Sequence, residues 1–212
     1  WFADSQMLWS DCYACLALAA ERTTTIQLGT GVAVSGTRPA PVNAASIATI
    51  NALAPGRTFF GVGSGNTAMR VMGQPPHRIR EFDTYLKTIT PLLRGEEASM
   101  GPLTTGARGE QPIRHIMPDK GFVAFDPPIP LYVSGFGPRS LGLAGQYGDG
   151  AVLALPPVPE VMEAFWKMIE TGARAAGREL ERESFYTTAL TTIVVLDEGE
   201  AVRRQRASHR SY

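Results

Sequence analysis

The stretch FFGVGSGNTAMR occupies residues 59 to 70 and sets the interpretation of the whole chain. An apolar run is followed by glycines at every second position, Gly61, Gly63 and Gly65, and then by residues that can open a helix. A buried strand that ends in a glycine loop before a helix is typical of α/β proteins that bind phosphate groups. The first question is therefore which kind of phosphate-binding loop this is.

Two familiar nucleotide-binding motifs do not fit this stretch. A Rossmann fingerprint, G-x-G-x-x-G, would need its third glycine at Asn66 or Ala68, and the sequence contains no Gly-Lys-Ser/Thr for a Walker loop. Gly63, Ser64 and Gly65 nevertheless offer backbone N–H groups just before an expected helix, where an anion is favoured. The alternative is a tight strand-to-helix turn, for which glycine alone is sufficient.

A second loop, SGFGPRS at residues 134–140, repeats the same pattern. It follows an expected strand over residues 129–134, opens an expected helix over 139–147, and adds the Arg139 guanidinium, which can bind phosphate through two hydrogen bonds. Both loops follow strands at their carboxyl ends, the edge where parallel α/β proteins bind ligands. Two such loops on one edge favour an anion site over two unrelated turns.

Strands and helices alternate along most of the chain. The expected strands are 1–3, 26–34, 58–62, 129–134, 151–155 and 185–196, and the expected helices are 11–22, 42–53, 78–94, 139–147 and 158–176. The strands are nearly all apolar, so we expect a parallel sheet with right-handed crossovers and both faces covered. A doubly wound sheet and a (β/α)8 TIM barrel share this pattern. Six units with a missing beginning and end favour a barrel that lacks its first and last strands.

Local signals define the ends of these elements and one interruption. We expect Ser10 to cap the first helix, over residues 11–22. In the expected helix over residues 78–94, we expect Pro91 to introduce a kink and Gly95 to form the C-cap. Residues 95–128 contain glycines and prolines without periodicity, so we predict a long surface excursion that can include a hairpin. We expect a single partial-barrel domain over residues 1–212, continued beyond both ends in the native protein.

Charge and hydropathy exclude several classes of partner. Twenty basic and twenty acidic residues give a formal net charge of zero, so we expect neither a nucleic-acid partner nor an anionic membrane surface. No apolar stretch approaches the roughly eighteen residues of a membrane span, and the first residues lack the pattern of a signal peptide. We therefore expect a cytoplasmic protein.

Cysteine and histidine residues do not indicate a metal site. Cys12 and Cys15 have the spacing of redox and half-zinc sites, but no second pair lies nearby, and both fall on the apolar stripe of an expected helix. We expect them to pack as small hydrophobic residues. His77 and His115 have no partners at metal-ligand spacing, so we expect structural roles and no metal.

Four segments taken together resemble the luciferase-like flavin and deazaflavin oxidoreductases. They follow the family's order and spacing and cover most of the chain, and they are residues 1–11, 26–57, 59–70 and 127–152. The resemblance implies a TIM barrel that binds reduced flavin or the deazaflavin coenzyme F-420 at the carboxyl ends of its strands. The patterns LGTGV, TRPAPV and GVGSGNTA are most similar to the F-420 branch that includes methylenetetrahydromethanopterin reductase.

The resemblance also implies where the cofactor lies. The phosphate-binding positions fall at Ser64, Gly65, Asn66, Gly135, Phe136, Gly137, Pro138 and Arg139. The ring would lie over Asp4, Gly31 and Val32, and a cis peptide bond is expected between Gly31 and Val32. The anion-binding loops found from the residues alone agree with the implied phosphate positions.

The resemblance implies hydride transfer between the cofactor and a small organic substrate, with Asp4, Ser5, Trp9 and Asn66 as candidate catalytic positions. The related sugar-phosphate dehydrogenases have a catalytic His at the position of Ser5 and a Glu at the position of Asn66. Because both acid–base groups are missing, reduction of an imine, an enone or a pterin-like C–N centre is favoured over alcohol oxidation. Asp4 can equally be an ordinary turn or helix-capping residue, and Trp9 can be a packed loop aromatic.

Three functions remain open on sequence alone. The first is an F-420-dependent oxidoreductase, the second an FMN-dependent luciferase-like monooxygenase, and the third a non-catalytic or truncated barrel that binds or scaffolds. The family resemblance also implies a homodimer. The substrate is not specified, because the pocket over the ring is built from loops and from segments beyond the carboxyl end.

Overall fold

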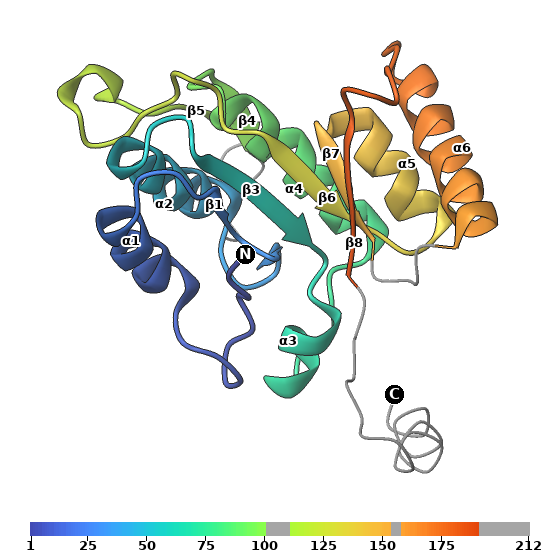
Figure 1. The fold of residues 1–212 in the computed structure, drawn as a ribbon, viewed down its shortest axis with the longest axis horizontal. Helices are drawn as coiled ribbons and strands as arrows, with labels where there is room; N and C mark the ends of the chain where they lie inside the picture. The colour runs from blue at the N-terminus through green and yellow to red at the C-terminus, as the bar shows by residue number, and fades with distance from the viewer. Residues whose placement is uncertain (101–110, 154–157, 191–212) are drawn as a thin grey trace.

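The computed structural model describes residues 1–100, 111–153 and 158–190, which form one curved parallel sheet with helices on its outer face (Figure 1). The sheet strands are β1 (Leu28–Gly29), β2 (Ala33–Val34), β3 (Thr58–Gly63), β6 (Leu131–Ser134), β7 (Gly150–Leu153) and β8 (Tyr186–Ala189). The helices are α1 (Cys12–Arg22), α2 (Ala40–Leu53), α3 (Asn66–Val71), α4 (Ile79–Leu92), α5 (Pro138–Tyr147) and α6 (Pro159–Ala175). No helix in these ranges is long and apolar enough to cross a membrane.

The strands lie side by side in chain order. The order is β1-β3-β6-β7-β8, with β2 also beside β3, and every pairing in this sheet is parallel. Phe2 forms an isolated parallel β-bridge with Thr30, the residue that follows β1 in the chain. The prediction of a parallel α/β sheet is confirmed, in the form of a half-barrel. The ends of two expected strands, residues 154–155 and 191–196, lie outside the described residues.

The expected strand over residues 26–34 is wrong as a continuous element. It consists of β1 and β2, both paired with β3, and between them the Thr30 hydroxyl donates a 2.6 Å hydrogen bond to the Gly61 carbonyl. A side chain thus replaces the regular ladder at this point. The cis peptide bond expected between Gly31 and Val32 is present.

The two faces of the sheet differ in what covers them. Phe60 and Val62 of β3 point into the core that the helices cover, together with Leu131 and Val133 of β6. On the opposite, concave face an aromatic row crosses the sheet, with ring-centroid distances of 4.4, 5.3 and 4.6 Å along the series Trp1, Phe59, Tyr132 and Tyr186. Both ends of this row are exposed to solvent, with Trp1 46% and Tyr186 45% exposed.

Two predicted helix ends are corrected by the structure. Asp11, not Ser10, caps α1, because its side-chain Oδ1 accepts a 2.9 Å hydrogen bond from the Ala14 N–H. Helix α4 ends at Leu92 rather than at residue 94, with Pro91 inside its last turn. Gly95 then reverses the chain with φ of +74°, as a helix-ending glycine does.

The excursion over residues 95–128 contains the hairpin that the sequence left open. Strands β4 (Ala98–Met100) and β5 (Gln111–Ile113) pair antiparallel, and the 3-10 helix η1 (Pro118–Lys120) follows. Asn51 of α2 anchors the return of this segment, because its Nδ2 donates to the carbonyls of Ala124 and Pro127 at 3.1 Å each. The excursion therefore packs back onto α2.

Glycines set the close packing of α5 against α6. A Cβ on Gly145 would meet the Ile169 carbonyl oxygen, and a Cβ on Gly172 would meet the Gly142 carbonyl oxygen. A Cβ on Gly142 would instead meet only the Gly172 Cα, at 3.9 Å. The helices can approach this closely only because Gly145 and Gly172 carry no side chain.

We expect Gly172→Ala to lower the free energy of unfolding by about 1 to 2 kcal/mol, since overpacking outweighs the gain in helix propensity. Gly142→Ala is the matched control in the facing helix, and it should raise stability by about 0.5 to 1 kcal/mol. Urea unfolding measures both. Equal shifts for the two variants would contradict the packing described for this helix pair.

Candidate functional site

The two glycine loops meet at one edge of the sheet. Strands β2, β3 and β6 are neighbours and end at Val34, Gly63 and Ser134, so both loops leave the sheet on the same side. A Cβ on Gly63 would lie 3.2 Å from the Val32 side chain and 3.4 Å from the Ser134 Cβ. Val32 and the starts of the two glycine loops, at Gly63 and Ser134, are therefore adjacent.

The first loop, Ser64 to Asn66, is shaped by backbone rather than by side chains. Gly65 has φ of +85°, and a Cβ there would run into the Val34 side chain, so no other residue fits without strain. The Ser64 carbonyl accepts a 3.1 Å hydrogen bond from the His77 N–H. Asn66 begins α3 and is exposed, and its Oδ1 accepts a 2.8 Å hydrogen bond from Arg70 Nε.

The second loop, Gly135 to Arg139, is held by a serine hydroxyl. The N–H groups of Phe136 and Gly137 both donate to Ser140 Oγ at 3.2 Å. Nothing lies within 4 Å of the position that a Cβ on Gly137 would take, so this side of the loop is open. Arg139 is exposed at the start of α5. The loop therefore keeps an ordered shape around an open space at a helix N-terminus.

Asp4 is buried in an ion pair that the sequence analysis missed. Its carboxylate is 2% exposed and accepts hydrogen bonds of 2.8 and 2.9 Å from Arg38 Nη1. Arg38 Nη2 also donates to Asp11 Oδ2 at 2.7 Å, and its guanidinium lies 4.8 Å from the ring centre of Tyr13. Arg38 thus joins the loop after Phe2 to the loop after β2, and Asp4 caps none of the described α-helices.

Buried groups around this ion pair are not acid–base groups at neutral pH. Burial raises the pKa of Cys12 to about 12, and the negative charge of Asp4 adds to the effect. Burial likewise raises the pKa of Tyr13 and Tyr85, which hydrogen-bond Asn43 from either side. Cys12 is a free, buried thiol, which confirms its packing role. Within the described ranges no cluster of His, Cys, Asp and Glu can hold a metal.

The loop that carries Ser5 and Trp9 lies beside this pair. The Ser5 carbonyl accepts hydrogen bonds from the N–H groups of Leu8 and Trp9, which closes a turn. Trp9 is 69% exposed, so the alternative of a packed loop aromatic is wrong. Gln6 Nε2 donates to Asp4 Oδ1 at 2.7 Å. Gln6 Oε1 is then the one buried side-chain polar atom without a partner in the described part of the chain.

A second polar pair at this edge was also missed. Ser35 Oγ and His77 Nδ1 share a 3.0 Å hydrogen bond, and Ser35 is 3% exposed. The two residues are 42 positions apart, and no local pattern in the sequence connects them. The pair ties the loop after β2 to the segment that follows the first glycine loop, which gives His77 the structural role expected for it.

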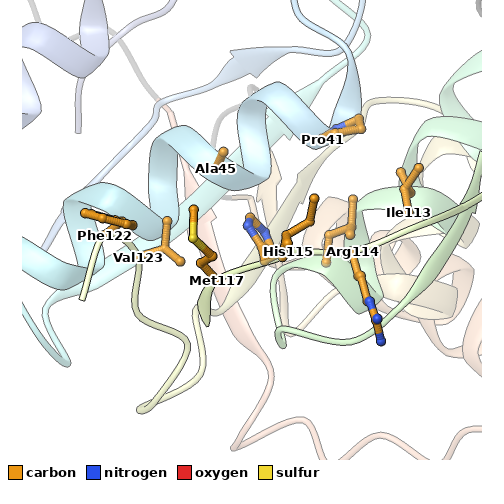
Figure 2. Close-up of a pocket in the computed structure, with 10 residues that line it drawn as sticks. Pro41, Ala45, Ile113, Arg114, His115, Met117, Phe122 and Val123 are labelled. Atoms are coloured by element: carbon orange, nitrogen blue, oxygen red, sulfur yellow. The ribbon is translucent and has the colours of Figure 1, made fainter. Parts of the chain in front are cut away.

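An apolar pocket of about 370 Å³ lies away from this edge, between α2 and the excursion (Figure 2). Figure 2 shows Pro41 and Ala45 on the α2 side and His115, Met117 and Val123 on the excursion side. His115 packs against Phe125 at 4.5 Å between ring centroids, and burial lowers its pKa. Arg114 lines this pocket, but no carboxylate does.

The fold and the edge together define the class of protein. The chain is a parallel α/β protein with two glycine loops and a buried carboxylate–guanidinium pair at the carboxyl ends of neighbouring strands. This is the edge where proteins of this class commonly bind ligands. The chain belongs to the luciferase-like monooxygenase family, whose model matches residues 1–212.

Individual relatives place the chain more closely within this family. A 5,10-methylenetetrahydromethanopterin reductase of Methanolobus tindarius is 34% identical over 174 residues, which are 80% of this chain and 49% of that protein. An F-420-dependent glucose-6-phosphate dehydrogenase of Beutenbergia cavernae is 34% identical over 143 residues, or 65% of this chain and 40% of that protein. The chain thus spans about half the length of the relatives it matches.

A solved structure agrees with these matches. The coenzyme F-420-dependent tetrahydromethanopterin reductase from Methanopyrus kandleri superposes with a TM-score of 0.70 at 26% identity. The superposition covers 90% of this chain and 56% of that structure. A monooxygenase from Streptomyces bottropensis shares the fold, with a TM-score of 0.65 at 21% identity.

We expect Arg38→Met to lower the free energy of unfolding by about 3 kcal/mol, because it leaves the Asp4 carboxylate buried without its partner. The double variant Asp4→Asn with Arg38→Met should recover at least half of this loss. Arg174→Met removes a guanidinium from an exposed ion pair with Glu170 and should cost about 0.5 kcal/mol or less. Denaturant unfolding compares the variants, and equal losses for Arg38 and Arg174 would contradict the role given to Arg38.

Proposed function

We propose that the chain belongs to an oxidoreductase that transfers a hydride between coenzyme F-420 and a small organic substrate. The observation that carries this proposal is the placement of two glycine loops on adjacent strand ends beside the Gly31–Val32 edge. The names of the relatives support the choice of cofactor, because both the glucose-6-phosphate dehydrogenase and the Methanopyrus reductase are named as F-420-dependent. FMN is the alternative cofactor.

The residues at the edge fit such a cofactor. Gly137 leaves an open space beside the N-terminus of α5, where a phosphate is favoured, and Arg139 stands next to it. Gln6 Oε1 is a buried acceptor without a donor, and a deazaflavin ring carries an N–H on its pyrimidine edge. In the proposal, the phosphate is held by Ser64, Gly65, Asn66, Gly135, Phe136, Gly137, Pro138 and Arg139, and the ring lies over Asp4, Gly31 and Val32.

The bound cofactor supplies the hydride chemistry, and the protein supplies orientation and electrostatics. Arg38 neutralises Asp4 and fixes the loop of Ser5 and Trp9. Because Trp9 is exposed, its side chain can line the substrate pocket. Neither Ser5 nor Asn66 is an acid–base group at neutral pH. The site therefore favours reduction of an electrophilic C–N or enone carbon over oxidation of an alcohol that needs a protein base.

We further propose that the half-barrel is part of a (β/α)8 TIM barrel. In this proposal, residues 1–212 form a single partial domain that does not include the first and last strands of the barrel. The exposed ends of the aromatic row on the concave face support this view, because a closed barrel buries that face. We also propose a homodimer. Exposed apolar side chains on the excursion support it, with Ile116 88% and Phe122 64% exposed.

Titration of the purified protein with coenzyme F-420 and with FMN, followed by tryptophan fluorescence, tests the cofactor. We expect saturable quenching by F-420 and at least about tenfold weaker binding of FMN, a difference of about 1.4 kcal/mol. Binding of FMN alone would favour a flavin-dependent monooxygenase. Binding of neither cofactor would favour a barrel that only scaffolds, and would overturn the proposal.

Gly137→Val tests where the phosphate lies. Gly137 has φ of −116° and open space around it, so valine fits the fold but fills the space assigned to the ligand. We expect the affinity for F-420 to fall at least about tenfold in a variant that stays folded at the assay temperature. Because valine is a poorer N-cap than glycine, the midpoint of thermal unfolding without cofactor should fall by a few degrees only. Unchanged affinity in this folded variant would place the phosphate elsewhere.

A further inference from the structure

A groove of about 710 Å³ runs along the outside of α5, between α4 and α6. Its floor is apolar, with Gly142 and Leu143 of α5 and Met168 of α6. One end of it is formed by Pro138 and Arg139, which are also the last residues of the second glycine loop. The groove therefore continues from the proposed phosphate position onto the helix layer.

The rim of this groove carries an excess of positive charge. Arg80 of α4, Arg139 of α5 and Lys167 of α6 line it and are exposed, and Asp83 is its one carboxylate. Asp83 Oδ1 accepts a 2.8 Å hydrogen bond from the Tyr147 hydroxyl. Three cations from three different helices thus face one groove.

The nearby carboxylates Glu163 and Glu170 of α6 form their ion pairs with other cations than Lys167. Glu163 pairs with Arg182 at 2.7 Å and Glu170 pairs with Arg174 at 2.8 Å. None of the four ion pairs found among the described residues involves Arg80, Arg139 or Lys167. These side chains are therefore available to an external anion that is long enough to pass from one to the next.

We propose that this groove binds the acidic oligoglutamate tail that follows the phosphate of coenzyme F-420. The inference rests on the proposed function, because it takes the phosphate to lie at the Gly135–Arg139 loop. The tail alternates methylene groups with carboxylates. Its methylene groups suit the apolar floor and its carboxylates suit Arg80 and Lys167 on the rim, while Arg139 stands between the phosphate and the start of the tail.

The test compares three forms of the ligand in fluorescence titrations: the deazaflavin chromophore without phosphate, the coenzyme without glutamates, and the coenzyme with its long tail. The protein is compared with the double variant Arg80→Gln with Lys167→Gln. Each exposed charge contributes about threefold in affinity, so we expect the double variant to bind the long-tailed coenzyme about tenfold more weakly. Its affinity for the coenzyme without glutamates should stay unchanged.

Arg22→Gln with Arg94→Gln is the control variant, since it removes the same charge from exposed positions outside the groove. It should bind all three ligands as the parent protein does, and added salt should reduce the preference for the long tail in the parent only. Equal affinity for tailed and tail-less coenzyme, or an equal loss in the control, overturns the groove assignment and leaves the proposed function standing. Failure of every form to bind overturns the proposed function itself.

Discussion

Strand β3 is the constraint on which the site depends. All six of its residues are buried, and it is paired in parallel with β1 and β2 on one edge and with β6 on the other. Adjacent parallel strands have their carboxyl ends at the same edge of the sheet, so the loops after β3 and β6 lie next to each other. Gly61 and Gly63 allow this close packing. A Cβ on Gly61 would meet the Thr30 carbonyl oxygen, and a Cβ on Gly63 would lie 3.2 Å from the Val32 side chain and 3.4 Å from the Ser134 Cβ.

The start of the chain is attached to this edge by the backbone of Phe2, by the packing of Trp1 on Phe59 and by an ion pair. Beyond one β-bridge between Phe2 and Thr30, the loop of Ser5 and Trp9 is held by Arg38, which binds Asp4 on one side and Asp11 on the other. A buried carboxylate is unfavourable unless it is paired and hydrogen-bonded. The same guanidinium therefore stabilises the fold and sets the position of the loop that lies nearest to the proposed ring.

The sequence predicted what depends on local pattern and strand order. The parallel sheet, the shared edge of the two glycine loops and the hairpin in the excursion are all present. The cis bond at Gly31–Val32, which the family resemblance implied, is present as well. Arg38 and the Ser35–His77 pair were not predicted, because their partners are distant in sequence and single charged or polar residues carry no periodicity. The break between β1 and β2 was not predicted, because threonine is common in strands. In the structure the Thr30 hydroxyl donates a hydrogen bond to the Gly61 carbonyl.

The Ser140 hydroxyl has a consequence for how an anion is recognised at α5. It already accepts hydrogen bonds from the N–H groups of Phe136 and Gly137. A phosphate that binds these N–H groups must therefore replace Ser140 Oγ as their acceptor. Such an exchange yields little net free energy, because a hydrogen bond is replaced and not added. In the proposed site, the serine hydroxyl takes the place of the phosphate as acceptor of these two N–H groups, so discrimination between ligands would depend on net charge and shape.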